Sequence, residues 1–168
     1  AQTVAIPDTN FEQALIDLGF DTNGLNGNIL TSEAQVIDSL KLSNPINNVL
    51  LPNVSVKITD LTGIEAMTNL ISLEAGYNTI TSVNLSQNIA LTNLFLHSNQ
   101  LTTIDVSNNT SLEKLGVMYN QIPSVDVSLL SNLKQLFLHN NLLTTIDVSL
   151  NTNLTWLNTS NNNLEDID

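Results

Sequence analysis

Residues 91–101 read LTNLFLHSNQL, and the pattern of this segment occurs four more times in the chain at one constant interval. The interval is visible in its equally spaced asparagines, Asn78, Asn99, Asn120, Asn141 and Asn162. These asparagines are each 21 residues apart. A fixed period of about this length is typical of a solenoid protein, in which each repeat forms one turn and contacts only its neighbours. The sequence therefore predicts a coil with one turn for every repeat. The other segments are LISLEAGYNTI (70–80), LEKLGVMYNQI (112–122), LKQLFLHNNLL (133–143) and LTWLNTSNNNL (154–164).

The apolar positions of the repeat indicate which side chains point into the core. Alternation in the first half of each repeat predicts a short strand, and strands of a parallel sheet lie about 4.8 Å apart. Two more apolar positions predict the opposite wall. The four predicted columns are Leu73, Leu94, Leu115, Leu136 and Leu157; Ala75, Leu96, Val117, Leu138 and Thr159; Ile80, Leu101, Ile122, Leu143 and Leu164; and Val83, Ile104, Val125, Ile146 and Ile167. The amides of the repeated asparagines form a fifth column and are expected to bond the backbone of the turns.

The consensus L-x-x-L-x-L-x-x-N-x-L resembles the leucine-rich repeat, and the intervening stretch TTIDVSNNTS is similar to repeats of secreted, internalin-like bacterial surface proteins. The resemblance covers residues 37 to 168. It implies an α/β-type solenoid, a right-handed leucine-rich-repeat coil with a parallel β-sheet on its concave face and a helical cap at the N-terminus. It also implies that the concave face recognises a partner, usually a protein, and that the mature chain is secreted or lies on the cell surface.

Residues 1–38 differ in composition and are predicted to cover the first turn of the coil as a cap. Asp8 or Thr9 can begin a helix with one apolar face, and Gly19 can end it. Ser32 and Gln35 have the spacing of a capping box, which predicts a second helical or turn-like segment.

The coil is predicted over residues 39–168, with irregular first repeats at 39–69 and regular repeats at 70–168. The stretch NNVLLPNVSVK (47–57) reads as an insertion, which should form a loop on one rim. Thr159 interrupts an apolar column, and the chain ends at Asp168 without a polar capping repeat. Either the coil continues in a longer precursor or its last turn is covered, for example in a homodimer formed through the C-terminal repeat.

Charge and composition exclude several classes of partner. Sixteen acidic residues stand against four lysines with no arginine, for a net charge of −12, so nucleic acids and anionic membranes would be repelled. No apolar stretch approaches the roughly 20 residues that cross a bilayer. The chain has no cysteine, which excludes disulfides, thiolate metal sites and cysteine nucleophiles.

The residues between the inward leucines are expected to point out of the concave face, and their types favour recognition. Outside the cap, every aromatic residue, both histidines and one of the two methionines fall there. Aromatic residues and methionine are enriched at protein interfaces, which favours a protein partner over the alternatives of a carbohydrate on the same face or rings that only pack on one another. The predicted ligand-binding residues are Tyr77, Phe95, His97, Lys114, Met118, Tyr119, Phe137, His139 and Trp156.

The spacing within this set predicts a notch and argues against catalysis. Phe95 and Phe137 stand two turns apart, about 10 Å, with Gly116 between them as the floor of a notch with aromatic walls. His97 and His139 are separated by the same distance, too far for one zinc ion. No acid and base pair is evident, so we expect a recognition or adhesion module and no enzyme, with no catalytic residues.

Two groups of acidic residues need separate interpretations. Asp105, Asp126, Asp147 and Asp168 recur once in every repeat, and we expect them to be exposed because stacked carboxylates repel. The loop DTNGLNGNILTSEA (21–34) partly resembles a calcium loop, which makes calcium the one candidate cofactor. The alternative is a Gly/Asn turn that leads into a helix. The candidate ligands are Asp21, Asn23, Asn26 and Glu33.

Overall fold

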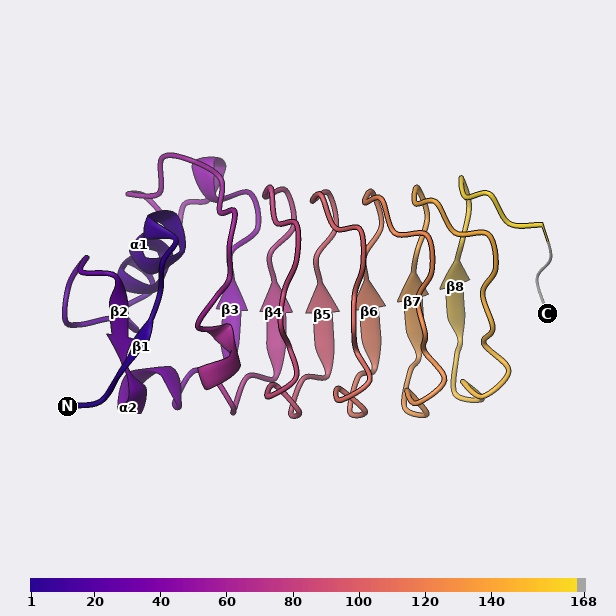
Figure 1. Ribbon diagram of the computed structural model, residues 1–168, viewed down its shortest axis with the longest axis horizontal. Helices are drawn as coiled ribbons and strands as arrows, with labels where there is room; N and C mark the ends of the chain where they lie inside the picture. Colours follow the sequence, from indigo (N-terminus) through magenta and orange to yellow (C-terminus); the bar gives the residue numbers. More distant parts are fainter. Residues whose placement is uncertain (166–168) are drawn as a thin grey trace.

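Six short strands stack side by side in the order of the sequence and form one parallel sheet (Figure 1). The computed structural model describes residues 1–165. Each strand pairs with the next one repeat later, so that Leu73 lies beside Leu94 and Leu94 beside Leu115. The strands are β3 (Ser39–Lys41), β4 (Ser72–Glu74), β5 (Asn93–Phe95), β6 (Lys114–Gly116), β7 (Gln135–Phe137) and β8 (Trp156–Asn158). The prediction of a right-handed leucine-rich-repeat solenoid is confirmed.

The core runs the length of the coil as stacks of aliphatic side chains. Leu94, Leu115 and Leu136 are fully buried, whereas Leu157 is 37% exposed because no further described turn covers it. In the predicted fourth column, Ile104 and Ile146 are buried, whereas Val83 and Val125 are only partly buried. A further column two residues later was not predicted from the sequence, and its members Leu85, Val106 and Val127 are at most 2% exposed. Ile167 lies outside the described residues.

The asparagine column is a hydrogen-bonded ladder, as predicted. Asn120 Nδ2 donates to the carbonyls of Val117 in its own turn and Leu96 in the preceding one, both at 3.0 Å. Its Oδ1 accepts from the amide of Leu101 at 2.9 Å. The other members of the column bond in the same way. Each asparagine therefore joins two turns and satisfies buried backbone groups that would otherwise lack partners.

A second ladder, absent from the sequence interpretation, stands in the return half of the turns. Asn88, Asn109 and Asn151 are buried, and each donates to two carbonyls of the preceding turn. Leu130 occupies the same position in the intervening turn and is also buried. The periodic signal of this column is weak because one of its four members is apolar.

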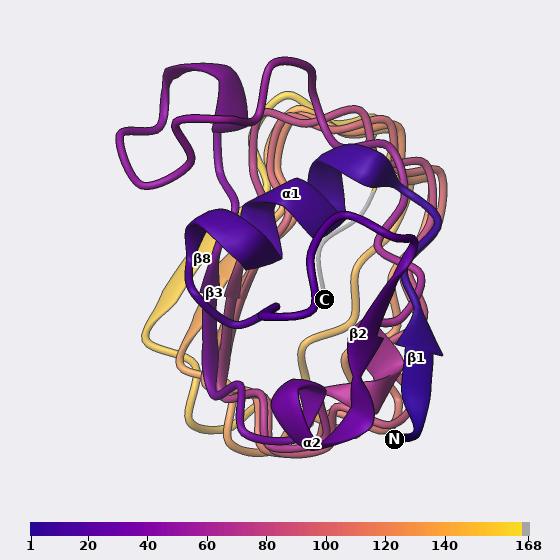
Figure 2. The same ribbon diagram turned by 90° about the vertical axis from the view of Figure 1, so that its left-hand side faces the viewer.

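The cap consists of two elements that were expected and a two-stranded antiparallel sheet that was not (Figure 2). Helix α1 (Thr9–Asp17) begins at the predicted cap residue Asp8 and is closed by Gly19, which adopts φ +78°. Strands β1 (Thr3–Ala5) and β2 (Asn28–Leu30) pair antiparallel, and α2 (Thr31–Ala34) follows directly. The predicted capping box is wrong, because Leu30 precedes α2 and no side chain caps it.

Asp8 joins the cap to the coil. Its Oδ1 accepts from the amides of Asn10 and Phe11 at the start of α1. Its Oδ2 accepts from the amide and hydroxyl of Thr59 and from the amide of Asp60 in the first irregular repeats. Burial opposes the charge of Asp8, but the bonds from Thr59, Phe11 and Asp60 outweigh it and lower its pKa. The ionised side chain therefore fastens the helix to the coil.

The irregular repeats carry two short 3₁₀ helices, Pro45–Asn47 and Ile64–Ala66, and the insertion between them. The insertion is held by buried Leu51 and Val54 and by Asn53, which donates through its amide and side chain to Asp17 at the end of α1. No helix within residues 1–165 combines the length and apolarity needed to cross a bilayer.

Candidate recognition face

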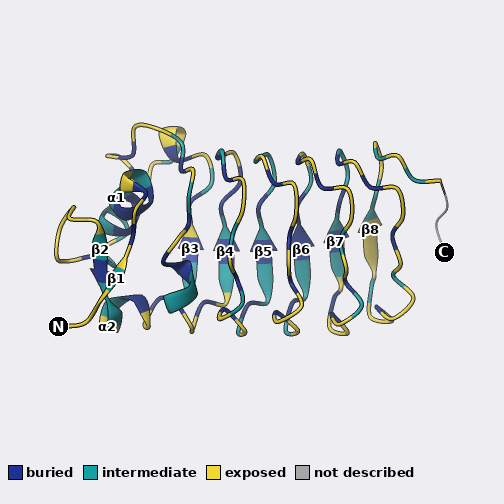
Figure 3. Ribbon diagram, in the orientation of Figure 1, coloured by how far each residue is buried: buried dark blue, intermediate teal, exposed yellow. Residues whose placement is uncertain are grey.

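The outer side of the parallel sheet presents the candidate site. We call it the strand face, and it comprises the side chains of β3–β8, and of the three residues after each strand, that point away from the core. Figure 3 shows β4–β7 as half-buried and β8 as exposed. All nine sequence-predicted binding residues lie here, and Tyr77, Tyr119 and Trp156 are the most exposed at 53%, 54% and 57%. Phe95, His97, Lys114, Met118, Phe137 and His139 are half-buried.

One position of the strand face has an unusual backbone conformation. The residue just before the asparagine of each ladder turn adopts left-handed φ, from 55° to 57°. Asparagine tolerates this region, and it stands there at Asn140 and Asn161. The bulky rings of Tyr77 and Tyr119 do not favour it, at a cost of about 1 kcal/mol or more. The left-handed backbone conformation therefore does not explain why tyrosine stands at these two positions. The exposure of both rings points to a role at the surface.

Each tyrosine packs edge-on against a histidine of the next turn. The ring centroids of Tyr77 and His97 are 5.0 Å apart at 87°, and those of Tyr119 and His139 are 5.3 Å apart at 81°. T-shaped pairs of this kind contribute about 0.5–1.5 kcal/mol beyond the area they bury. The strand face therefore carries two equivalent tyrosine–histidine pairs, which the sequence analysis named as residues but did not group.

The predicted open notch between Phe95 and Phe137 is wrong. Their ring centroids approach to 6.3 Å with a tilt of 41°, well inside the separation of their backbones. Phe95 leans over Gly116, where an added Cβ would lie 2.5 Å from its Cδ1. The two rings thus fill the space above the glycine, because strand spacing fixes backbone positions and leaves the rotamers free.

His97 also lies over a glycine. A Cβ at Gly76 would collide with its imidazole, and the Nδ1 atoms of His97 and His139 are buried without a hydrogen-bond partner. Burial lowers the pKa of His97, partly opposed by the charge of Glu74. The neutral ring is therefore the form that the fold favours near neutral pH, and it presents an aromatic surface.

Comparisons with known proteins agree with this architecture. Neither the protein-family models nor the curated proteins contain a match. Among solved structures, the chain is similar to internalin C2 of Listeria monocytogenes, with 27% identity and a TM-score of 0.81 over 99% of this chain and 72% of that one. An internalin F of the same organism is 34% identical, with a TM-score of 0.66 over 81% of this chain and 46% of that one. The chain is an internalin-like leucine-rich-repeat protein.

A more distant similarity shows the fold alone. A leucine-rich-repeat protein of Leptospira interrogans is 23% identical, with a TM-score of 0.71 over 83% of the internalin-like chain and 36% of its own. The internalin-like chain also spans less than half of internalin F. The functions of these longer proteins can therefore be applied to this chain only as proposals.

Of the four candidate calcium ligands, Asp21, Asn23 and Asn26 lie in the loop between α1 and β2, and Glu33 lies in α2. Asn26 bonds Asn23, and Glu33 accepts from the hydroxyl of Thr22. Asp21 Oδ1 accepts from the amide of Asn23, whereas Asp21 Oδ2 and Glu33 Oε2 are buried without partners. Within residues 1–165, no three acidic, histidine or cysteine side chains are grouped as metal ligands. Calcium therefore stays a prediction.

The repeated aspartates are exposed, as expected. Asp105, Asp126 and Asp147 each accept from the amide of the serine two residues later, at 2.8–2.9 Å. Hydrogen bonds from those serines lower the pKa of each carboxyl. The aspartates thus shape the return turns. Asp168 lies outside the described residues.

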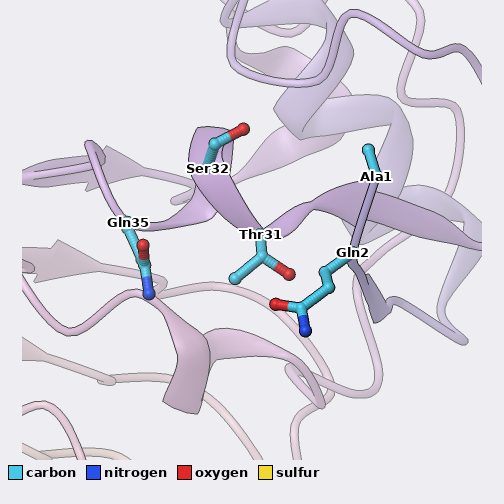
Figure 4. A pocket seen from close by; sticks show the side chains of 5 residues that line it. All are labelled: Ala1, Gln2, Thr31, Ser32 and Gln35. Carbon is cyan, nitrogen blue, oxygen red and sulfur yellow. The ribbon is translucent and has the colours of Figure 1, made fainter.

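A small depression lies at the cap, about 260 Å³ in volume, between the N-terminus and α2 (Figure 4). It is lined by Ala1, Gln2, Thr31, Ser32 and Gln35, none of which is among the nine predicted binding residues. None of these side chains is ionisable, and the hydroxyls of Thr31 and Ser32 and the amides of Gln2 and Gln35 can form hydrogen bonds.

The insertion adds an apolar surface that the sequence analysis did not single out. Val49, Leu50 and Val56 on this loop, together with Ile46 just before it, are between 49% and 91% exposed. The loop leaves the coil just after Asn44, which holds the same left-handed position in its turn as Tyr77 does later. Figure 2 shows it projecting beyond the coil on the side of β3. The signal that could have found it is the apolar run VLLP inside an insertion.

Proposed function

We propose that the strand face binds a protein partner as a non-catalytic recognition or adhesion module of a secreted or cell-surface protein. Leucine-rich-repeat solenoids present extended surfaces suited to this role. The observation that carries the proposal is the placement of Tyr77 and Tyr119. Both rings are about half exposed at backbone positions where asparagine is the physically favoured residue. Backbone strain of this kind is concentrated at functional sites, and tyrosine is enriched among the residues that dominate binding at protein interfaces.

The apolar insertion favours a protein over a glycan. Exposed aliphatic side chains such as Val49, at 91% exposure, gain free energy when an apolar surface covers them. A polysaccharide offers little surface of that kind. Carbohydrate binding on the aromatic face is the alternative, and it would leave the insertion without a role.

The test compares matched variants for binding to arrays of extracellular protein domains and of polysaccharides. We expect a protein ligand, and Phe137→Ala with Tyr119→Ala should weaken it by roughly thirtyfold or more, since central contacts are typically worth about 2 kcal/mol. The control, Asp126→Asn with Asp147→Asn, should change the affinity less than about twofold, because exposed turn carboxylates contribute little.

Three results would contradict the proposal. The first is undiminished affinity in an aromatic variant that melts like wild type, and the second is a larger loss in the aspartate control. The third is binding to polysaccharides only. If the alanine variant unfolds, Tyr119→Asn replaces it, because asparagine stands at the equivalent left-handed position in other turns.

A further inference from the structure

The tyrosine–histidine pairs of the strand face recur every two turns of the coil and not in every turn. Tyr77 with His97 and Tyr119 with His139 form two pairs of the same geometry, two repeats apart in the sequence. On the alternate turns the tyrosine position holds Ser98 and Asn140. Since neighbouring strands lie about 4.7–4.9 Å apart, the two pairs repeat at about 9.4–9.8 Å along the coil.

A partner cannot bind this part of the strand face by adding a strand to the sheet. Strands β4, β5, β6 and β7 each have a neighbour on both sides, so their backbone groups are already paired. Recognition there depends on side chains. The tyrosine hydroxyls can donate to carbonyl groups of a ligand, and the rings can pack against its apolar atoms.

The repeat distance distinguishes between regular ligand backbones. A polyproline II helix has three residues per turn at about 3.1 Å each, which places every third residue about 9.3 Å along its axis. The heptad of an α-helix spans about 10.5 Å. Residues on one side of a strand recur at about 6.6 Å. The polyproline II repeat therefore matches the two-turn spacing best. Its backbone has no internal hydrogen bonds, so its carbonyls are available to donors on the protein.

Charge selects among polyproline II ligands. The chain carries a net charge of −12 with four lysines, so the molecule as a whole attracts a basic ligand and repels an acidic one. On the strand face, Glu74 lies in the turn that supplies Tyr77, whereas Lys114 lies in the turn that supplies Tyr119 and Lys41 in β3. The basic side chains of the ligand are therefore expected beside Glu74 and away from the two lysines.

We propose that the two tyrosine–histidine pairs bind a basic polyproline II segment of a protein, which lies along the coil axis with residues three apart on successive pairs. This inference rests on the proposed function and specifies the chemistry of the partner. Aromatic-lined grooves recognise proline-rich segments in other folds because the ligand is already ordered and loses little entropy.

The first test uses a labelled peptide, (Pro-Pro-Lys)₄, titrated with the protein and followed by fluorescence anisotropy. We expect saturable binding that weakens as salt is raised. The control peptide (Ala-Ala-Lys)₄ keeps the charge without the polyproline II backbone, and (Pro-Pro-Glu)₄ keeps the backbone with the opposite charge. Both should bind at least tenfold more weakly. The proposal is overturned if no saturable binding occurs below about 1 mM, or if the alanine peptide binds as tightly as (Pro-Pro-Lys)₄.

The second test moves one tyrosine while the other stays in place. Tyr77→Asn should reduce peptide binding about tenfold and leave the melting temperature close to that of wild type. Adding Asn161→Tyr restores two tyrosines at a spacing of two turns and should recover part of the affinity. Adding Asn140→Tyr instead places them one turn apart and should not. All these positions share the left-handed conformation. Equal recovery in the two double variants overturns the spacing argument.

The two levels of the hypothesis fail separately. If the peptide does not bind but Phe137→Ala with Tyr119→Ala still weakens a protein ligand from the array, the polyproline II inference falls and the proposed function stands. If those variants affect neither ligand, both fall.

Discussion

Single asparagine side chains decide how the buried backbone of this coil is satisfied, and the two ladders differ in how completely they do so. In the first, Asn120 uses both ends of its amide, donating to two carbonyls and accepting from the amide of Leu101. In the second, Asn109 only donates, and its Oδ1 is buried without a partner. A residue that both donates and accepts cannot be replaced by an apolar one without leaving a buried N–H unpaired.

This difference predicts unequal costs for the same substitution. Asn120→Leu should lower the free energy of unfolding by about 1–3 kcal/mol, because the buried amide of Leu101 loses its side-chain acceptor. The carbonyls of Leu96 and Val117 each keep a second asparagine donor, Asn99 and Asn141. Asn109→Leu should cost clearly less, because the structure already accommodates Leu130 at the same position of the next turn. Urea unfolding of both variants measures the difference. Equal costs, or a larger cost at Asn109, would show that the ladders contribute alike.

At the scale of elements, the loop between α1 and β2 takes its shape from Glu12. Its Oε1 accepts from the amides of Asn26, Gly27 and Asn28 at 2.6–2.9 Å. Gly27 adopts φ +84° in this turn. The glycine and asparagines that resemble a calcium loop in the sequence thus also serve a turn around a buried carboxylate. Asp21 sits beside it, and burial together with the charges of Glu12 and Glu33 raises its pKa.

The raised pKa of Asp21 predicts how the stability of the protein depends on this carboxyl with and without a bound metal. A carboxyl whose folded pKa lies above its ordinary 3.8 opposes folding once it ionises, so stability declines as pH rises above about that value. In chelator at pH 7, Asp21→Asn should therefore melt at the same or a higher temperature than wild type. With calcium bound, wild type should melt higher than in chelator, and both Asp21→Asn and Glu33→Ala should lose the increment. No calcium shift in wild type would remove the site from consideration.

Elements were predictable where local chemistry and pattern agreed. Helix α1 follows from Asp8 and its apolar face, and the strands follow from alternating leucines. The β1–β2 pairing joins two very short segments on either side of α1, and nothing in so short a strand shows alternation. The notch failed because ring rotamers depend on neighbours such as Gly116. The division between residues 1–38 and 39–168 stays a prediction that limited proteolysis can test.

At the scale of the whole molecule, charge and apolar surface act in opposite directions on self-association. The net charge is −12, and within residues 1–165 the one ion pair is Lys134 with Glu113, at 2.9 Å. Two copies therefore repel each other at low salt. The last described turn has the opposite effect, because Trp156 and Leu157 are 57% and 37% exposed and β8 pairs with β7 alone. Such an edge is a template for another strand.

These opposed terms predict that the chain associates through its last repeat in a salt-dependent way. The Debye length falls from about 10 Å at 0.1 M to about 3 Å at 1 M, so salt screens the repulsion and leaves the apolar contact in place. Light scattering at tens of micromolar should show a monomer at low salt and a growing dimer fraction at high salt. Leu157→Lys should abolish the dimer, whereas Leu150→Lys, at a position 62% exposed in a return turn, should not. A monomer at every salt concentration, or equal effects of the two lysine variants, would leave the strand face as the one recognition surface still proposed for the chain.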